Sequence, residues 1–297
     1  MYYFLAFLSG ILISLTILQN GELAGLYGLY VSTVFIHLTG LMIIGPVVFF
    51  KKDKPFEKMQ KWYLYLGGAV GLITVVCTAS SFGRISVSAI MALGLLGQSI
   101  TGLFVDRFGL MGMPRYPFYK SKLIGLVIIL AGIISMINNL EVLAVALSFF
   151  SGVTIVVARS LNGKLAELTS IRISSFYNYV TGIGAAIIVF LLLGGNEPIY
   201  SGIVISPHWY IYFGGALGLG FVAISNMIVP KISAFSLTLF LFVGQVFSGL
   251  LIDSLVLGEF SVRMLVGGLL VAVGLTVDLC IGKNRKKQAS DSNALLG

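Results

Sequence analysis

Charged residues are scarce in this sequence. They make up 10% of the 297 residues, while hydrophobic residues make up 58% and the mean hydropathy is +1.02. A soluble domain carries about a quarter charged residues, so this chain lacks the polar surface that would cover a globule of its size. The composition excludes a soluble protein and predicts an integral membrane protein.

Cysteine is also nearly absent. The two cysteines, Cys77 and Cys280, fall in separate apolar runs. A disulfide framework needs more cysteines in an exposed, oxidising setting. We therefore interpret both as small apolar packing residues.

The sequence motifs of common enzyme classes are missing as well. There is no H-E-x-x-H, no G-x-S-x-G, no P-loop and no dinucleotide-binding fingerprint. The only two histidines, His37 and His208, are far apart in the sequence. The sequence therefore predicts no enzymatic activity, no catalytic residue, no metal site and no bound cofactor.

What the chain does contain is a series of apolar runs, each long enough for a membrane-spanning helix of about 20 residues. They predict an all-α integral membrane protein with ten spans, near residues 3–20, 28–50, 62–81, 85–106, 121–138, 142–160, 173–194, 209–228, 231–253 and 262–282.

The basic residues indicate how these spans are oriented. Lys and Arg number 19 against 11 Asp and Glu, giving a net charge of +8. Of these 19, only Arg84 and Arg263 fall on the side opposite the N-terminus, and the other 17, Arg159 among them, fall on its own side. The positive-inside rule then predicts that both termini are cytoplasmic, with 283–297 as a disordered basic tail. The charge reflects topology and lipid headgroups, so no nucleic-acid partner is expected.

An internal repeat divides the sequence into two halves. Leu5–Gly40 aligns with Leu147–Gly182 at an offset of 142, and Trp62–Asp106 aligns with Trp209–Asp253 at an offset of 147. We therefore predict two repeats, 1–139 and 140–282. Each contains five spans, an odd number, so the second repeat is inverted relative to the first. Inverted repeats are typical of secondary transporters.

The pattern G-Q-x-x-x-G-L-x-x-D occurs at 97–106 and again at 244–253, and Phe108-Gly109-Leu110 follows its first copy. With the five-plus-five arrangement, it resembles the YdcZ-like branch of the bacterial drug/metabolite transporter (DMT) superfamily. The resemblance implies a multi-pass protein of the cytoplasmic membrane, with the first four helices of each half around a central substrate cavity. It also implies that the fifth and tenth helices are peripheral and often form a homodimer contact. It does not imply a substrate.

Polar side chains within predicted spans are candidates for substrate contact, because they are costly in a bilayer. Gln98 and Gln245 occupy equivalent positions and either bind substrate or join neighbouring helices. His37 and Tyr179 are also equivalent, and Asn178 precedes Tyr179. A buried histidine with a structural partner is the alternative for His37.

Four further residues have predicted structural or coupling roles. Asp106 and Asp253 end their helices, where a carboxylate needs a partner, so they form an ion pair, cap a loop or bind a coupling ion, H⁺ or Na⁺. Asn20 and Asn162 precede glycines at predicted helix ends, a position typical of C-capping.

Together these features predict a secondary active transporter that moves a small polar or amphiphilic metabolite by alternating access. A flippase for a lipid-linked group and an exporter of organic cations or drugs are the alternatives, and a channel or membrane-embedded sensor is a third class. The expected partners are a small solute and membrane lipid.

Overall fold

The computed structural model describes residues 1–54, 59–116, 141–201 and 205–255, together with isolated positions between 127 and 273. Eight helices in this part of the chain are long and apolar enough to cross a membrane, which confirms an all-α membrane protein. The predicted spans 121–138 and 262–282 and the tail 283–297 lie outside the described residues, apart from isolated positions. The long helices are α1 Tyr2–Tyr27, α2 Leu29–Phe50, α3 Gly67–Ser81, α4 Val87–Phe108, α6 Val142–Leu168, α7 Ile171–Leu193, α8 Gly214–Ile228 and α9 Ala234–Leu255. Short 3₁₀ helices, Trp62–Leu66 and Trp209–Phe213, lead into α3 and α8.

The two weakest predicted breaks between spans, after residues 81 and 228, are real, and a serine caps the helix that follows each. Ser86 accepts a hydrogen bond from the backbone N–H of Ala89 at the start of α4, at 3.2 Å. Ser233 accepts one from the N–H of Ser236 at the start of α9, at 3.1 Å. These are N-caps, and the two serines are equivalent in the repeat.

Two predicted helix ends are wrong. The sequence predicts that the first and sixth helices end near residues 20 and 160, but α1 continues to Tyr27 and α6 to Leu168. The polar triplets Asn20-Gly21-Glu22 and Asn162-Gly163-Lys164 look like breaks, yet their glycines pack closely against neighbouring side chains. Asn20 and Asn162 are therefore interior residues of helices and not C-caps.

The same error misplaced a charge. Arg159, near the end of the predicted span 142–160, was counted as a cytoplasmic charge, whereas it lies inside α6 and is only 4% exposed. It therefore contributes nothing to the charge bias between the loops.

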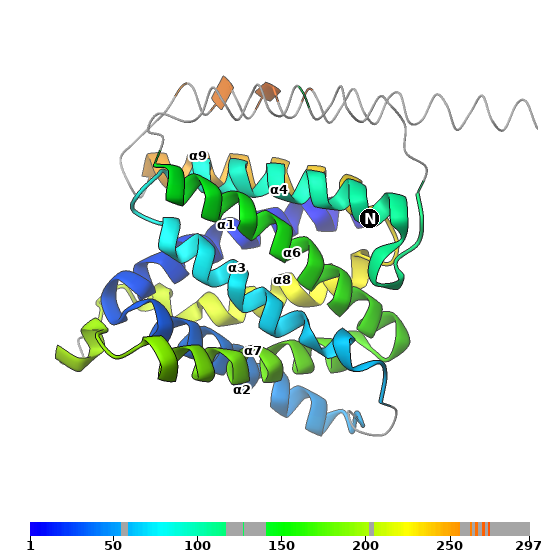
Figure 1. Ribbon diagram of the computed structural model, residues 1–297, viewed down its shortest axis with the longest axis horizontal. Coiled ribbons are helices and arrows are strands. Elements are labelled where there is room, and N and C mark those ends of the chain that lie inside the picture. The colour runs from blue at the N-terminus through cyan, green and yellow to red at the C-terminus, as the bar shows by residue number, and fades with distance from the viewer. Residues whose placement is uncertain are drawn as a thin grey trace, which may run out of the picture.

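The helices form three layers (Figure 1). The α4–α9 pair lies along one side of the bundle, the α2–α7 pair along the opposite side, and α1, α3, α6 and α8 lie between them. Much of the packing joins the two halves: α1 packs on α8 and α9, and α6 packs on α3 and α4. Within the described helices, neither half forms a separate bundle.

Close glycine contacts reproduce the sequence repeat in space. A Cβ on Gly10 of α1 would lie 2.0 Å from the backbone O of Leu241 in α9. A Cβ on the equivalent Gly152 of α6 would lie 1.9 Å from the backbone O of Gly94 in α4. Small residues that let helix backbones approach are typical of membrane helix packing, and both contacts obey the 142 and 147 offsets.

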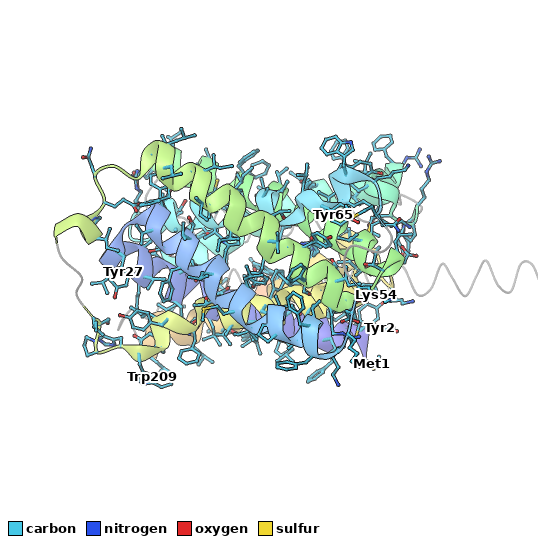
Figure 2. All side chains as sticks on the ribbon, turned by 90° about the horizontal axis from the view of Figure 1, so that it is seen from below. Met1, Tyr2, Tyr27, Lys54, Tyr65 and Trp209 are labelled. Carbon is cyan, nitrogen blue, oxygen red and sulfur yellow. The ribbon has the colours of Figure 1, made fainter. Side chains whose placement is uncertain are left out.

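Equivalent helices of the two halves run in opposite directions. The carboxylate of Asp106, at the C-terminal end of α4, binds the N-terminal end of α9. Figure 2 places Met1, Lys54 and Tyr65 at one end of the bundle and Tyr27 and Trp209 at the other. Trp209 is 68% exposed and its equivalent, Trp62, is 75% exposed, as expected for aromatic residues at membrane interfaces.

Candidate functional site

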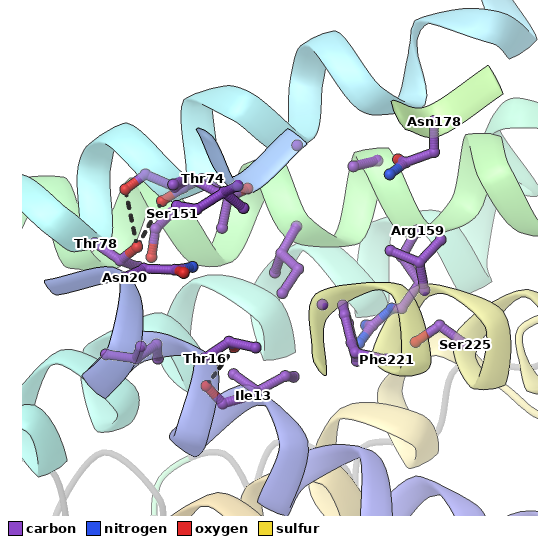
Figure 3. Close-up of a pocket in the computed structure, with 18 of the residues that line it drawn as sticks. Ile13, Thr16, Asn20, Thr74, Thr78, Ser151, Arg159, Asn178, Phe221 and Ser225 are labelled. Carbon is purple, nitrogen blue, oxygen red and sulfur yellow. Dashed lines mark hydrogen bonds between the residues drawn. The ribbon is translucent and has the colours of Figure 1, made fainter. Parts of the chain in front are cut away.

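A cavity of about 160 Å³ lies between the two halves, and all eight long helices contribute to its wall. All five predicted substrate residues line it: Gln98, Gln245, His37, Asn178 and Tyr179. Figure 3 shows part of its lining. The structure therefore brings these residues together, while their contact with a substrate stays a prediction. The other polar residues of the wall are Thr16, Asn20, Thr74, Thr78, Ser151, Arg159, Asn162, Ser225 and Asn226.

Arg159 is the charged residue of the lining. Its Nη1 donates to Oε1 of Gln98 at 3.4 Å, and its Nη2 donates to Oγ1 of Thr238 in α9 at 3.1 Å. Figure 3 shows the side chain reaching from α6 toward α8, near Phe221 and Ser225. The lining residues include no aspartate or glutamate, so the described wall carries a positive charge without a carboxylate.

The sequence analysis did not identify Arg159 as a cavity residue, because it predicted that the sixth helix ends at residue 160 and so placed Arg159 at the membrane surface. A helical register continued through that point gives the missing signal: Ser151, Ile155, Arg159 and Asn162 recur at spacings of three and four and so share one face. All four line the cavity.

Asn162 and Asn178 form the centre of a polar network beside the cavity. Nδ2 of Asn162 donates to Oδ1 of Asn178 at 2.7 Å. Ser174 donates its hydroxyl to the backbone O of Asn162 at 2.7 Å, and Nδ2 of Asn226 donates to Oγ of Ser174 at 3.2 Å. The network joins α6, α7 and α8 and fixes the orientation of these amides.

Some buried polar atoms of the lining have no hydrogen-bond partner within the described structure. They include Oδ1 of Asn20, Oγ of Ser225 and Oδ1 of Asn226. Ser225 and Asn226 are each only 2% exposed. Buried polar atoms are rarely left unpaired, and atoms on a cavity wall can be satisfied by a bound solute or water.

His37 and Tyr179 face each other in equivalent surroundings, with ring centroids 6.0 Å apart. The His37 ring packs against Gly182, and the Tyr179 ring against Gly40. Nδ1 of His37 lies 2.7 Å from the backbone O of Thr33, so this nitrogen carries the proton, because a carbonyl only accepts. Each ring has a structural contact and borders the cavity.

Gln98 and Gln245 are both buried, at 4% and 2% exposure. Gln98 accepts the hydrogen bond from Arg159. At the equivalent position in the other half, the hydroxyl of Ser14 donates to the backbone O of Gln245 at 3.2 Å. The two glutamines therefore occupy equivalent positions in the repeat, but Gln98 is bound through its side chain and Gln245 through its backbone oxygen.

Asp106 is buried but does not line the cavity. Its carboxylate accepts the backbone N–H groups of Ala234 and Phe235, at 2.8 and 3.2 Å. A carboxylate at the positive end of a helix is electrostatically favourable, so Asp106 caps α9 from another helix. Its coupling role stays a prediction, and the side chain of Asp253 lies outside the described residues.

No group of three or more His, Cys, Asp or Glu residues in the described part of the chain could hold a metal ion.

The chain was compared with curated proteins, solved structures and protein families. No curated protein matches it significantly. A crystal structure of another protein, 15% identical, superposes with a TM-score of 0.69 over 95% of this chain and 96% of that chain, which supports the fold alone. The sequence profile of a family described as "Putative inner membrane exporter, YdcZ" matches residues 1–135 and again residues 143–277. These are transporters, which implies a non-enzymatic function. The chain therefore belongs to the YdcZ family of the DMT superfamily, as a multi-pass protein of the inner, cytoplasmic membrane.

Proposed function

We propose that this protein is a secondary active transporter that moves a small polar or amphiphilic metabolite across the inner membrane by alternating access. The observation that carries the proposal is the cavity between the two halves, to which all eight long helices contribute polar side chains, together with equivalent helices that run in opposite directions. In secondary transporters, such halves exchange conformations around a central site. We propose ten spans with both termini cytoplasmic, as the loop charges indicate.

The ends of the α2–α7 pair support this mechanism. At one end, Asp53 after α2 pairs with Arg172 at the start of α7. At the other end, Glu197 after α7 accepts the backbone N–H groups of Tyr30 and Val31 at the start of α2. The acidic residue after α2 thus binds the N-terminal end of α7, and the acidic residue after α7 binds the N-terminal end of α2. Opening one end while keeping the other closed would expose the cavity to one side of the membrane at a time.

The electrostatics of the cavity disfavour an organic cation as the substrate. A cation in a site of low dielectric needs a carboxylate or an aromatic cage, whereas the described wall presents the Arg159 guanidinium and no acid. We therefore favour a water-soluble solute without a net positive charge over an organic cation.

Reconstitution tests the proposal. Ligands that raise the Tm of the purified protein, from a screen of amino acids, amines, nucleosides and sugars, are offered to proteoliposomes under an imposed H⁺ or Na⁺ gradient. We expect gradient-dependent accumulation of at least one ligand. If no solute moves faster than through protein-free vesicles, the transporter proposal fails. Movement of a labelled lipid would favour the flippase instead.

A further inference from the structure

We propose that Arg159 binds a carboxylate of the transported solute, which makes the substrate a small organic acid or amino acid with at least one N–H or O–H donor. This inference rests on the proposed transport function for its physiological meaning. The binding site itself is argued from the cavity alone.

The position of Arg159 in the repeat shows that its charge is not part of the duplicated pattern. At an offset of 142, the lining residues Ile13, Thr16, Ile17 and Asn20 of α1 correspond to Ile155, Ala158, Arg159 and Asn162 of α6. Isoleucine therefore occupies the equivalent position in an equivalent helix. An arginine inside a membrane span is costly, so its presence on one half alone calls for a ligand.

The surroundings of Arg159 leave part of its hydrogen-bonding capacity open. A guanidinium has five N–H donors in a planar fork, and its hydrogen bonds in the structure go to two neutral acceptors, Gln98 and Thr238. Asp106 acts on it electrostatically, but this carboxylate also holds two backbone N–H groups of α9. The planar fork matches a carboxylate, which can accept two hydrogen bonds side by side.

Neighbouring polar atoms indicate what else the solute carries. Ser225, whose Oγ is buried and unpartnered, lies on the side of the cavity toward which Arg159 points (Figure 3). Oδ1 of Asn226, the next residue of α8, is also buried and unpartnered. Both oxygens can accept a hydrogen bond, which a ligand with an N–H or O–H donor would supply. Ile13, Ile155 and Phe221 supply apolar wall for the rest of the molecule.

Two matched ligand series test this inference on the full-length purified protein. L-Alanine and L-lactate are compared with L-alaninamide, and L-phenylalanine and phenyllactate with L-phenylalaninamide. We expect the acids of at least one series to raise the Tm at millimolar concentration, and the amide of that series to leave it unchanged. Equal stabilisation by acids and amides, or no stabilisation by any acid, overturns the inference.

Variants then locate the effect. Arg159→Gln is expected to raise the acid concentration for half-maximal stabilisation at least about tenfold, whereas Arg159→Lys keeps the charge and part of the response. Arg84→Gln is the matched control, because Arg84 is exposed and pairs with Glu141 outside the cavity. If Arg159→Gln does not fold, Thr238→Val removes one of the partners that orient Arg159 and is expected to change the acid response by about threefold. If the acid concentration for half-maximal stabilisation is unchanged in Arg159→Gln, Arg159 does not bind the carboxylate. If Arg159→Gln does not fold, the same conclusion follows from an unchanged value in Thr238→Val.

Transport of the same solutes separates this inference from the proposed function. If acids bind in an Arg159-dependent way and nothing is transported, the site stands and the transporter proposal fails. If a solute without a carboxylate is transported and Arg159→Gln does not affect it, the transporter stands and the carboxylate site fails.

Discussion

Asp53 and Arg172 form a two-pronged ion pair that joins the segment after α2 to the start of α7. Nε of Arg172 lies 2.5 Å from Oδ2 of Asp53, and Nη2 lies 2.8 Å from Oδ1. Glu197 makes the equivalent connection at the opposite end of the same helix pair. Asp53 binds a side-chain cation, whereas Glu197 binds backbone N–H groups. Neutralising the acid therefore breaks an ion pair at one end and weakens a helix cap at the other.

The Asp53 pair predicts a pH dependence of stability. The hydrogen bonds from Arg172 hold the pKa of the Asp53 carboxyl below its ordinary value of 3.8. A carboxyl with a lower pKa in the folded state stabilises that state above its unfolded pKa and loses this contribution as the pH falls through its folded pKa. We expect Asp53→Asn to lower the Tm slightly where the carboxyl is charged, at pH values above about 5, and this difference to shrink as the pH falls through the folded-state pKa. Thermal unfolding of both proteins across this range checks the prediction, and a difference that persists at the lowest pH contradicts it.

Asp106→Ala removes the cap that α4 provides for α9. Two backbone N–H groups then lose their acceptor, and a capping substitution of this kind costs about 1–2 kcal/mol. We expect a clear loss of thermal stability and a smaller loss for Asp106→Asn, which keeps an acceptor but not the charge. A Tm for Asp106→Ala equal to that of the wild type would show that α9 does not depend on this contact.

Gly10→Ala and Gly152→Ala are expected to destabilise the protein to a similar extent, because they disturb equivalent interfaces. Each added methyl group would lie within 2.0 Å of a backbone oxygen, and overpacking costs about 1–3 kcal/mol. Gly184→Ala in α7 is the matched control, since its Cβ would meet nothing within 4 Å. The Tm of the three variants distinguishes close packing from a general effect of replacing glycine.

Gln98→Ala and Gln245→Ala test the candidate site by transport. Gln98 orients Arg159, so its loss is expected to weaken the apparent affinity about tenfold, equivalent to about 1.4 kcal/mol. Gln245 has no such connection, and we expect a smaller change. If both variants transport with unchanged apparent affinity, these glutamines serve packing alone.

Much of the fold could be predicted from the sequence because membrane helices are long apolar runs and the repeat aligns residue by residue. The breaks at Ser86 and Ser233 were predicted correctly although they are only a few residues long, since a helix of 40 residues does not fit a bilayer. The five candidate substrate residues gathered on one cavity wall because buried polar groups in membrane proteins face the bundle interior.

The sequence prediction was wrong where polarity was taken as a sign of exposure. Asn20 and Asn162 were read as helix ends, but the cavity accommodates their amides inside α1 and α6. Arg159 was counted as a topology charge for the same reason. Whether an arginine near a predicted boundary lies in a loop or in a cavity depends on the other half of the protein, which local hydropathy does not describe.

The difference between Ile17 and Arg159 has a consequence for how such a site can arise. A transporter assembled from two identical five-helix chains presents every cavity residue twice, so an arginine at this position would place two positive charges in one small space. Joining the halves in a single chain allows each copy to change alone. The central site can then carry a single charge, a state that a symmetric pair of identical chains cannot reach.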